Sequence, residues 1–369
     1  MRVALLPAAM LLALPRPGTA QYPDTTAADT TAHITWGAYA DAYYAYDFNI
    51  PPRHDRVFTT QAARWNEFNA NLTFLEANYK APRVRARAAL QAGTAVQFNY
   101  GAEPDTLAGL PNYLPLIQEL YAGVAPAENL WIDAGIFFSH IGSEGWISAD
   151  NPTYTRSLPA DFSPYYETGV RATWQATKKV TATAVFVNGW QIILENNQGK
   201  AGGLRLDYAV SPAVTLSYSN YLGNDLDSTT GVSRTRFFND FIARVTPDDR
   251  TLVIGTFDVG GQSGDRWYGG SLIAREKIGD RIAVSARYDG FHDPDGVVAA
   301  GIPRGDTIPG GLQTSGGSLG LDWTMRPGVL WRFEFRGFFG ADEPTFPKHT
   351  DGEFTDHDTA LITALTFRF

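Results

Sequence analysis

Apolar and polar residues alternate in short segments along most of the chain, and this alternation predicts β-strands. The last segment is the clearest, because Leu361, Leu365 and Phe369 fall on one face while Ala360 and Arg368 fall on the other. In an extended strand every second side chain points to the same side. We predict sixteen strands, at about 33–47, 67–79, 83–97, 115–125, 130–138, 165–177, 180–190, 202–211, 213–222, 236–246, 251–260, 266–277, 281–291, 314–326, 329–339 and 357–369.

The connections between these segments alternate between short and long. The short ones include 80–82, 178–179 and 327–328, whereas 139–164 is the longest and only 261–265 breaks the rhythm. An up-and-down barrel with short periplasmic turns and long outer loops has this alternation. Propellers and sandwiches repeat their turns by blade or by Greek key instead. An even number of strands leaves both chain ends on the periplasmic side.

Charged residues gather on the faces opposite the apolar ones. In the third segment Arg83, Arg85 and Arg87 alternate with Val84 and Ala86. An arginine that faces lipid at mid-membrane costs about 2–4 kcal/mol, so these arginines are expected inside. An interior that carries so many charges must contain water, because unpaired buried charge is too costly. A barrel of about sixteen strands is wide enough for an aqueous channel. The pattern therefore predicts an all-β, transmembrane, antiparallel up-and-down β-barrel that encloses a pore.

The amino terminus has the parts of a secretory signal peptide. Arg2 supplies the positive charge, 3–14 is apolar, and small residues precede the cleavage point. The apolar stretch is too short to span a membrane. We therefore divide the chain into a cleaved signal peptide at 1–20, a flexible lead-in at 21–32 and a barrel at 33–369, in the outer membrane of a Gram-negative bacterium.

Composition argues against several other functions. The chain has no cysteine, which excludes disulfides and thiolate metal sites, and its net charge of −9 gives no sign of nucleic-acid binding. Asp293 and Asp295 suit calcium as oxygen ligands, although solvated loop charge is the preferred interpretation. Ser139 and His140 are candidates for a hydrolase at the rim, but neighbouring strand residues point to opposite faces. We predict no enzyme, no cofactor and no metal.

Several short motifs resemble one family of outer-membrane proteins. They are Asp-Ala-Gly-Ile-Phe-Phe-Ser-His-Ile-Gly-Ser-Glu-Gly at 133–145, Asn-Pro-Thr-Tyr-Thr-Arg-Ser at 151–157, Tyr-Glu-Thr-Gly-Val-Arg at 166–171, Val-Asn-Gly-Trp at 187–190 and Ala-Arg-Tyr-Asp at 286–289. Together they resemble the OmpL-like β-barrel porin family. The resemblance implies an outer-membrane barrel that acts as a porin, and it brings no substrate and no catalytic residue.

The chain end carries a second resemblance. Phe367, Arg368 and Phe369 are similar to the carboxy-terminal signature of bacterial outer-membrane barrels. That signature implies recognition by the barrel-assembly machinery, with Phe367 and Phe369 as the assembly signal.

Charged residues of the predicted lumen are the candidate site. By analogy with general porins, the loop 139–164 folds inward and narrows the channel, although a loop lying outside the barrel is the open alternative. The arginine row of the third strand either selects anions or forms salt bridges with Asp41, Glu119 or Glu167. The lumen and constriction candidates are Arg83, Arg85, Arg87, Glu119, Glu144, Arg156, Glu167, Arg171, Asp289, Arg332, Glu334 and Arg336.

We predict a porin that forms a water-filled channel for passive diffusion of small hydrophilic solutes or ions. The alternative is a non-conducting barrel with a structural, adhesion or partner-docking role. The expected partners are outer-membrane lipid, the barrel-assembly machinery and small hydrophilic solutes, with no nucleic acid. A homo-oligomer is left open.

Overall fold

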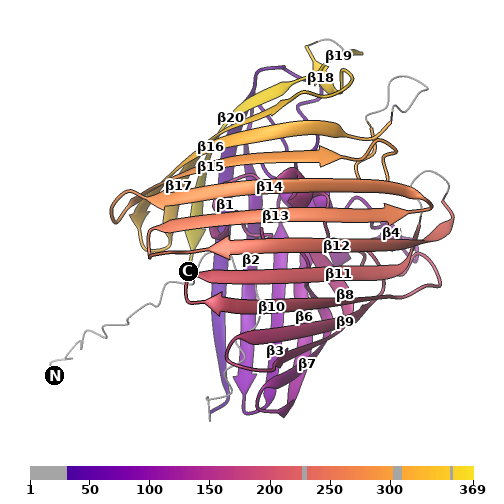
Figure 1. Cartoon of the computed structure of the whole chain (residues 1–369), viewed down its shortest axis with the longest axis vertical. Coiled ribbons are helices and arrows are strands. Elements are labelled where there is room, and N and C mark those ends of the chain that lie inside the picture. Colours follow the sequence, from indigo (N-terminus) through magenta and orange to yellow (C-terminus); the bar gives the residue numbers. More distant parts are fainter. Residues whose placement is uncertain (1–30, 227–230, 302–309, 350–351) are drawn as a thin grey trace.

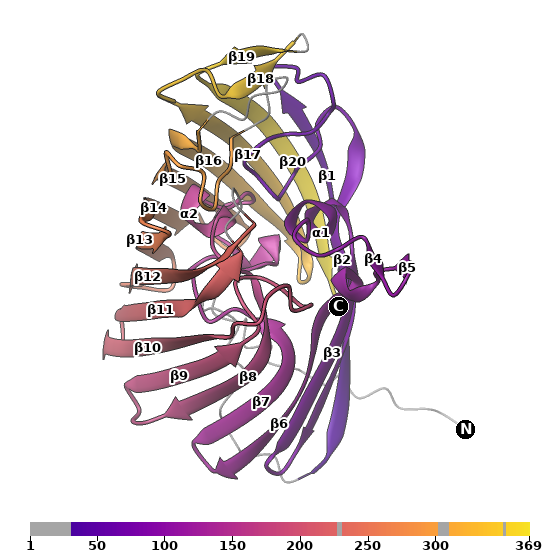
Figure 2. The same ribbon diagram turned by 90° about the vertical axis from the view of Figure 1, so that its right-hand side faces the viewer.

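Antiparallel strands close into a barrel in the residues that the structure, a computed structural model, describes: 31–226, 231–301, 310–349 and 352–369 (Figures 1 and 2). Within these ranges the sixteen barrel strands are β1 (His33–Asp47), β2 (Phe68–Ala81), β3 (Val84–Ala92), β6 (Ile117–Ala127), β7 (Leu130–Phe138), β8 (Tyr166–Gln175), β9 (Val180–Val187), β10 (Ala201–Ser211), β11 (Val214–Leu226), β12 (Ser233–Val245), β13 (Thr251–Gln262), β14 (Asp265–Lys277), β15 (Ile282–His292), β16 (Gln313–Arg326), β17 (Val329–Phe339) and β20 (Asp358–Arg368). Each strand pairs with its neighbours in chain order, and β20 pairs with β1 to close the ring.

Short elements occupy the long connections. They are α1 (Thr94–Asn99), the hairpin β4 (Thr106–Leu107) and β5 (Leu110–Pro111), the 3₁₀ turns η1 (Leu114–Leu116) and η2 (Ser148–Asp150), α2 (Leu158–Asp161), and the hairpin β18 (Phe346–Lys348) and β19 (Glu353–Thr355). No helix in the described part of the chain is long and apolar enough to cross a membrane.

The sixteen predicted strands are confirmed, with ends shifted by a few residues. The third differs most, because it was predicted over 83–97 and β3 ends at Ala92. Gly93 follows with φ of +136°, and a Cβ there would lie 2.3 Å from the carbonyl oxygen of Asn71. Glycine alone tolerates that geometry, so the chain turns here and α1 carries Val96 into a buried apolar cluster.

The amino-terminal predictions concern residues that are mostly not described. The signal peptide at 1–20 and nearly all of the lead-in at 21–32 lie outside the described residues. The first barrel strand, β1, begins at His33.

The outer and inner faces of the barrel wall carry different kinds of side chain. Trp36 and Phe68 point outward and are 78% and 89% exposed, as suits side chains that meet lipid. Charged residues such as Asp133 and Arg332 point inward and are buried. This burial means that the barrel interior is filled by other parts of the chain.

Because neighbouring strands run up and down in chain order, the described parts of the long connections lie at one end of the barrel and the short turns lie at the other. One connection at the end with the long connections is short: the turn Ser263-Gly264 joins β13 to β14, and both of its residues have positive φ. Such a two-residue turn matches the twist of the strands it joins. The loop 139–164 turns inward, and Figure 2 shows its helix α2 inside the ring of strands.

Removing Phe369 should reduce the amount of folded barrel in the outer membrane. Its backbone N–H donates a 3.0 Å hydrogen bond to the Ala38 carbonyl, and its ring is 81% exposed where β20 meets β1. The deletion removes the last bond of the closing seam. Heat-modifiable mobility on gels measures the folded fraction, with Phe369→Tyr as a control that keeps the aromatic ring. Equal folded fractions in the deletion and in the control would contradict this expectation.

Candidate functional site

The loop 139–164 is anchored at its start to the wall formed by β8, β10 and β11. His140 places Nδ1 2.8 Å from the Glu167 carboxylate and Nε2 2.8 Å from the Asn220 carbonyl oxygen. Arg205 donates a 3.2 Å hydrogen bond to the His140 carbonyl. A Cβ at position 203 would lie 2.3 Å from the His140 ring, so Gly203 makes room for the imidazole. The loop therefore enters the barrel at a place shaped to receive it.

The middle of the loop is bonded to a distant part of the wall. The Thr155 N–H donates to Glu334 of β17 at 2.8 Å, and the Leu158 N–H donates to Asp289 of β15 at 2.8 Å. Carboxylates that accept backbone N–H groups form strong, charge-assisted hydrogen bonds. Because the loop starts from β7, these bonds carry it across the lumen, and the inward-folding alternative is the one that the structure supports.

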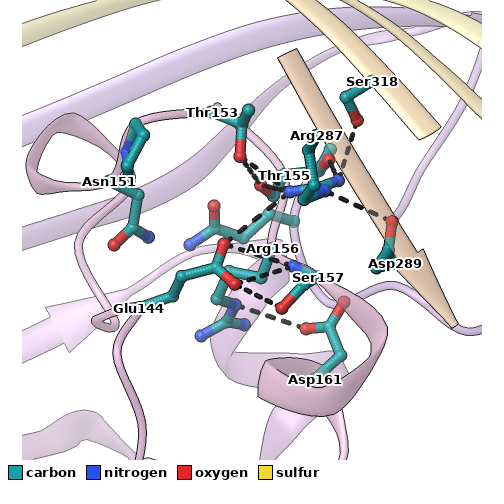
Figure 3. A network of polar contacts seen from close by, with 12 residues as sticks. Glu144, Asn151, Thr153, Thr155, Arg156, Ser157, Asp161, Arg287, Asp289 and Ser318 are labelled. Carbon is teal, nitrogen blue, oxygen red and sulfur yellow. Dashed lines mark hydrogen bonds and ion pairs between the residues drawn. The ribbon is translucent and has the colours of Figure 1, made fainter. Parts of the chain in front are cut away.

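Arg287 of β15 connects several of these groups, as Figure 3 shows. It donates to the Thr153 hydroxyl at 2.7 Å, to the Thr155 carbonyl at 2.5 Å and to the Ser318 hydroxyl at 2.8 Å. Its guanidinium also lies 3.7 Å from the carboxylate of Glu144, and neither side chain is exposed. One wall cation thus holds two separate parts of the loop.

Arg156 contacts other residues of the loops and does not face an open channel. Its guanidinium lies 3.6 Å from the centre of the Tyr165 ring and 5.1 Å from the centre of the Trp146 ring. Its Nε is 3.3 Å from the carboxylate of Asp161, which accepts a 2.7 Å hydrogen bond from Thr60 in the connection between β1 and β2. These contacts fasten two loops together inside the barrel, at the end where the long connections lie.

Burial and ion pairs act in opposite directions on the acids of the loop. Burial raises the pKa of Glu144 and of Asp161, and the nearby Arg287 and Arg156 lower it in part, so both pKa values stay above the usual range. Burial lowers the pKa of His140, but the charge of Glu167 and the hydrogen bonds to Glu167 and to the Asn220 carbonyl together outweigh this effect, and the pKa ends above its usual value. The His140–Glu167 ion pair is therefore present at low pH and is lost as pH rises through the raised pKa of His140.

The predicted arginine row of the third strand is wrong at its first position. Arg83 lies before β3, in the turn after β2, with φ of +59°, and its exposed side chain donates to the Pro126 carbonyl. A tight turn imposes its own backbone angles, so the period-two alternation does not extend to Arg83. Arg87 is on the lumen face and pairs with Glu76 and Glu119, both at 2.5 Å.

The salt-bridge alternative for this row is correct for Glu119 but not for the other two predicted acids. Asp41 accepts hydrogen bonds from Tyr154 and Asn71, and Glu167 is bonded to His140. A further partner was not predicted: Arg85 binds Asp133 through two hydrogen bonds of 2.7 Å.

The Arg85–Asp133 pair depends on a glycine in the strand between them. Both residues are paired with Gly123 of β6, and a Cβ there would lie 2.1 Å from the Asp133 carboxylate. Arg171 of β8 approaches the same carboxylate from the other side at 3.1 Å. Asp133 is thus shared by two arginines, and this arrangement follows from strand register, which no local sequence pattern contains.

The strand β17 contributes three of the predicted residues, and all three are engaged. Arg332 binds Asp322 at 2.8 Å, Arg336 binds Asp289 at 2.6 Å, and Glu334 accepts from Thr155 of the loop. With the exception of Arg83, all the predicted lumen residues are engaged in ion pairs or hydrogen bonds on the inner side of the wall, and all of these except Arg87 are buried.

The alternative sites are not supported by their contacts. The Ser139 hydroxyl donates to Glu167, and both ring nitrogens of His140 already lie against acceptors, so the imidazole is not placed to take a proton from Ser139. Asp293 accepts hydrogen bonds from three backbone N–H groups of its own loop, and these bonds stabilise its carboxylate without a metal ion. Among the described residues, no group of three or more potential ligands is arranged to hold a metal.

Comparison with known families agrees with this architecture. The family model "Putative beta-barrel porin-2, OmpL-like" matches residues 33–369, the whole of the barrel. The chain belongs to this family. It is therefore a porin-family barrel of the outer membrane of Gram-negative bacteria. No curated protein sequence matches the chain.

Solved porins share the fold at low sequence identity. The outer membrane channel DcaP of Acinetobacter baumannii has a TM-score of 0.62 and 10% identity, covering 92% of this chain and 99% of that one. Salmonella typhi OmpF, solved in complex with daunomycin, has a TM-score of 0.59 and 11% identity, covering 91% and 97%. The anion-selective porin of Comamonas acidovorans has a TM-score of 0.57 and 10% identity, covering 92% and 100%. These likenesses establish the barrel fold of the present porin.

Replacing Asp133 by Asn should strongly destabilise the barrel. The change leaves Arg85 and Arg171 buried beside a neutral group, and breaking a buried ion pair in this way costs about 3–5 kcal/mol. Urea unfolding of the purified porin, followed by tryptophan fluorescence, measures the loss. Asp105→Asn, at an exposed loop position, is the control and should change the free energy of unfolding by about 0.5 kcal/mol or less. Equal stability of the two variants would contradict a central role for Asp133.

Proposed function

We propose that this porin forms a water-filled channel for passive diffusion of small hydrophilic solutes or ions, with the loop 139–164 as its constriction. The support is the crossing of that loop through the lumen, where it bonds to Arg205 on one side and to Arg287 and Glu334 on the other. Any solute that passes must move beside the loop. No chemical step is part of this proposal.

The pairing of charges supports selection by size more than by net charge. Arg85 and Arg171 share Asp133, and Arg275 and Arg332 share Asp322. Paired charges create a transverse field across a narrow passage without a large net potential. Such a field orders water and favours small polar solutes over apolar ones of the same size.

A non-conducting barrel with a structural, adhesion or partner-docking role remains the second candidate. Its support is an apolar cluster in which loop residues meet the barrel wall. Phe58 and Phe346 contact each other edge to face, and Phe162 packs against Phe291 of the wall. An apolar constriction can close a pore by excluding water.

The remaining predictions about the cell are part of the same proposal. We propose that the short turns and both chain ends face the periplasm, that 1–20 is removed on export, and that Phe367 and Phe369 are read by the barrel-assembly machinery. We also propose a homo-oligomer, since one of the similar structures, OmpT of Vibrio cholerae, is described in a trimer form. Chemical cross-linking of the protein in outer membranes tests that assembly.

Shortening the constriction loop should enlarge the channel. Replacing residues 146–162 with a short Gly-Ser linker removes the segment that crosses the lumen, so single-channel conductance in a planar bilayer should rise by about twofold or more. The matched control shortens 104–112, which holds the hairpin β4–β5 that Figure 2 shows projecting outside the barrel. Conductance in the control should match the parent. A parent and a loop variant that both fail to conduct would favour the non-conducting alternative.

Reversing the charge of Arg87 should shift ion selectivity toward cations. Arg87 lies between Glu76 and Glu119 on the lumen face, so Arg87→Glu creates three adjacent acids. Their field acts over a Debye length of about 8 Å at physiological salt. Arg83→Glu makes the same charge change at the exposed turn and should shift the reversal potential less. Equal shifts in a salt gradient would mean that the lumen position of Arg87 has no special influence.

A further inference from the structure

Two aspartates face each other on neighbouring strands of the lumen wall. Asp240 of β12 is directly opposite Asp258 of β13, and the two residues are 0% and 3% exposed. Like charges directly opposite each other destabilise a sheet. Two ionised carboxylates sharing one buried position cannot both stay charged without compensation. The pair is therefore a place where the wall holds a proton.

The hydrogen bonds of the pair indicate where that proton lies. The two side chains are hydrogen-bonded to each other. Each carboxyl group also has a buried oxygen, Oδ1, that has no donor among the described residues. An ionised carboxylate only accepts, whereas a protonated one donates once. One proton between Asp240 and Asp258 gives both groups a partner and leaves the pair with a single negative charge.

The start of the constriction loop is attached to the same pair. The Gly142 N–H donates to Asp240 at 2.9 Å, and the next residue, Ser143, places its hydroxyl 2.8 Å from that of Thr256 on β13. Arg205 of β10 donates to the Gly142 carbonyl at 3.1 Å and is the cation beside Asp240. This part of the loop is thus held between a cation and an anion of the wall.

Two other polar groups lie around the pair, and one of them, Glu144, would increase the repulsion between carboxylates when the proton is lost. Ser219 of β11 donates to Asp240 at 3.2 Å and carries no charge. Glu144 of the loop acts on Asp258 as a further negative charge. With the shared proton gone, Asp240, Asp258 and Glu144 place three carboxylates close to one another, and the repulsion falls where the loop is attached.

We propose that the proton shared by Asp240 and Asp258 positions the start of the loop 139–164, so that its loss at alkaline pH loosens the loop and widens the channel. This inference rests on the proposed channel function. The pair acts as a positioning element, since neither aspartate needs to touch the solute. The proton leaves to solvent on deprotonation and returns on acidification, so the change is reversible.

Two other ionisable pairs near the loops are rivals for the same pH response. The His140–Glu167 pair anchors the loop from β8 and also weakens as pH rises. At the rim, Asp47 and Asp358 are hydrogen-bonded to each other beside the connection 48–67. The experiment must therefore separate Asp258 from His140 and from Asp358.

Single-channel conductance as a function of pH makes this separation. The parent should show mean conductance that rises reversibly as the pH is raised from neutral to alkaline, because the shared proton is then lost. Asp258→Asn supplies a permanent amide donor to Asp240, so its conductance should stay at the low-pH value of the parent. Glu76→Gln removes a wall carboxyl on β2, on the opposite side of the ring from Asp240 and Asp258, and should keep the rise. If Asp258→Asn does not fold, Asp240→Asn places the amide donor on the other strand and should give the same flat profile.

The proposal is overturned if the parent profile is flat, or if Asp258→Asn still shows the full rise. It is also overturned if His140→Gln or Asp358→Asn removes the rise while Asp258→Asn keeps it. Each of these outcomes assigns the response to a different group.

A labelling measurement separates this inference from the channel function itself. The chain has no cysteine, so Ser143→Cys provides a unique thiol at the attachment point. Its reaction with a small methanethiosulfonate reagent at alkaline pH should be faster than in the Ser143→Cys, Asp258→Asn double variant at the same pH. If the two labelling rates differ but the protein does not conduct, the channel function is refuted and the role of the aspartate pair in anchoring the loop is upheld. Equal rates in the two variants would refute the anchor whether or not the protein conducts.

Discussion

A charged side chain cannot stay unpaired inside this barrel, and the rest of the structure depends on that constraint. The lipid outside excludes charge from one face of every strand, so the arginines and acids of the chain collect on the inner face. There they are too buried to rely on water alone. The loop 139–164 supplies polar backbone groups to these wall charges, because its Thr155 carbonyl accepts from Arg287 and its Leu158 N–H donates to Asp289. The loop is inside because the wall needs its polar groups.

The same constraint explains the glycines at points of close approach. Gly123 lets Arg85 reach Asp133 across the strand between them, and Gly203 leaves room for the His140 ring. In both places a side chain as small as a methyl group would block an ion pair or a loop anchor. These glycines serve the charge network, because a sheet alone would gain from a bulkier residue at either position.

The strands could be predicted from the sequence, whereas the pairing inside the barrel could not. Period-two alternation is a local property, so segments such as 329–339 were found with the right inward residues. Partners in the lumen are set by register and by where a long loop crosses, which no local pattern contains. Asp133 was noted as the first residue of the motif 133–145, but its two arginine partners were not identified. Arg83 shows the opposite failure, because alternation was extended into a turn where it has no meaning.

Formation of a disulfide between the loop and the wall is the most direct test of the account. Ser143 and Thr256 place their side-chain oxygens 2.8 Å apart although they are 113 positions apart in sequence. With both changed to cysteine in this cysteine-free chain, the two sulfurs should lie close enough to bond without backbone movement. We expect near-complete disulfide formation in folded protein in the outer membrane, detected by mass spectrometry of the linked peptides. Folded protein with two free thiols under mild oxidation would show that the loop does not lie against the lumen wall.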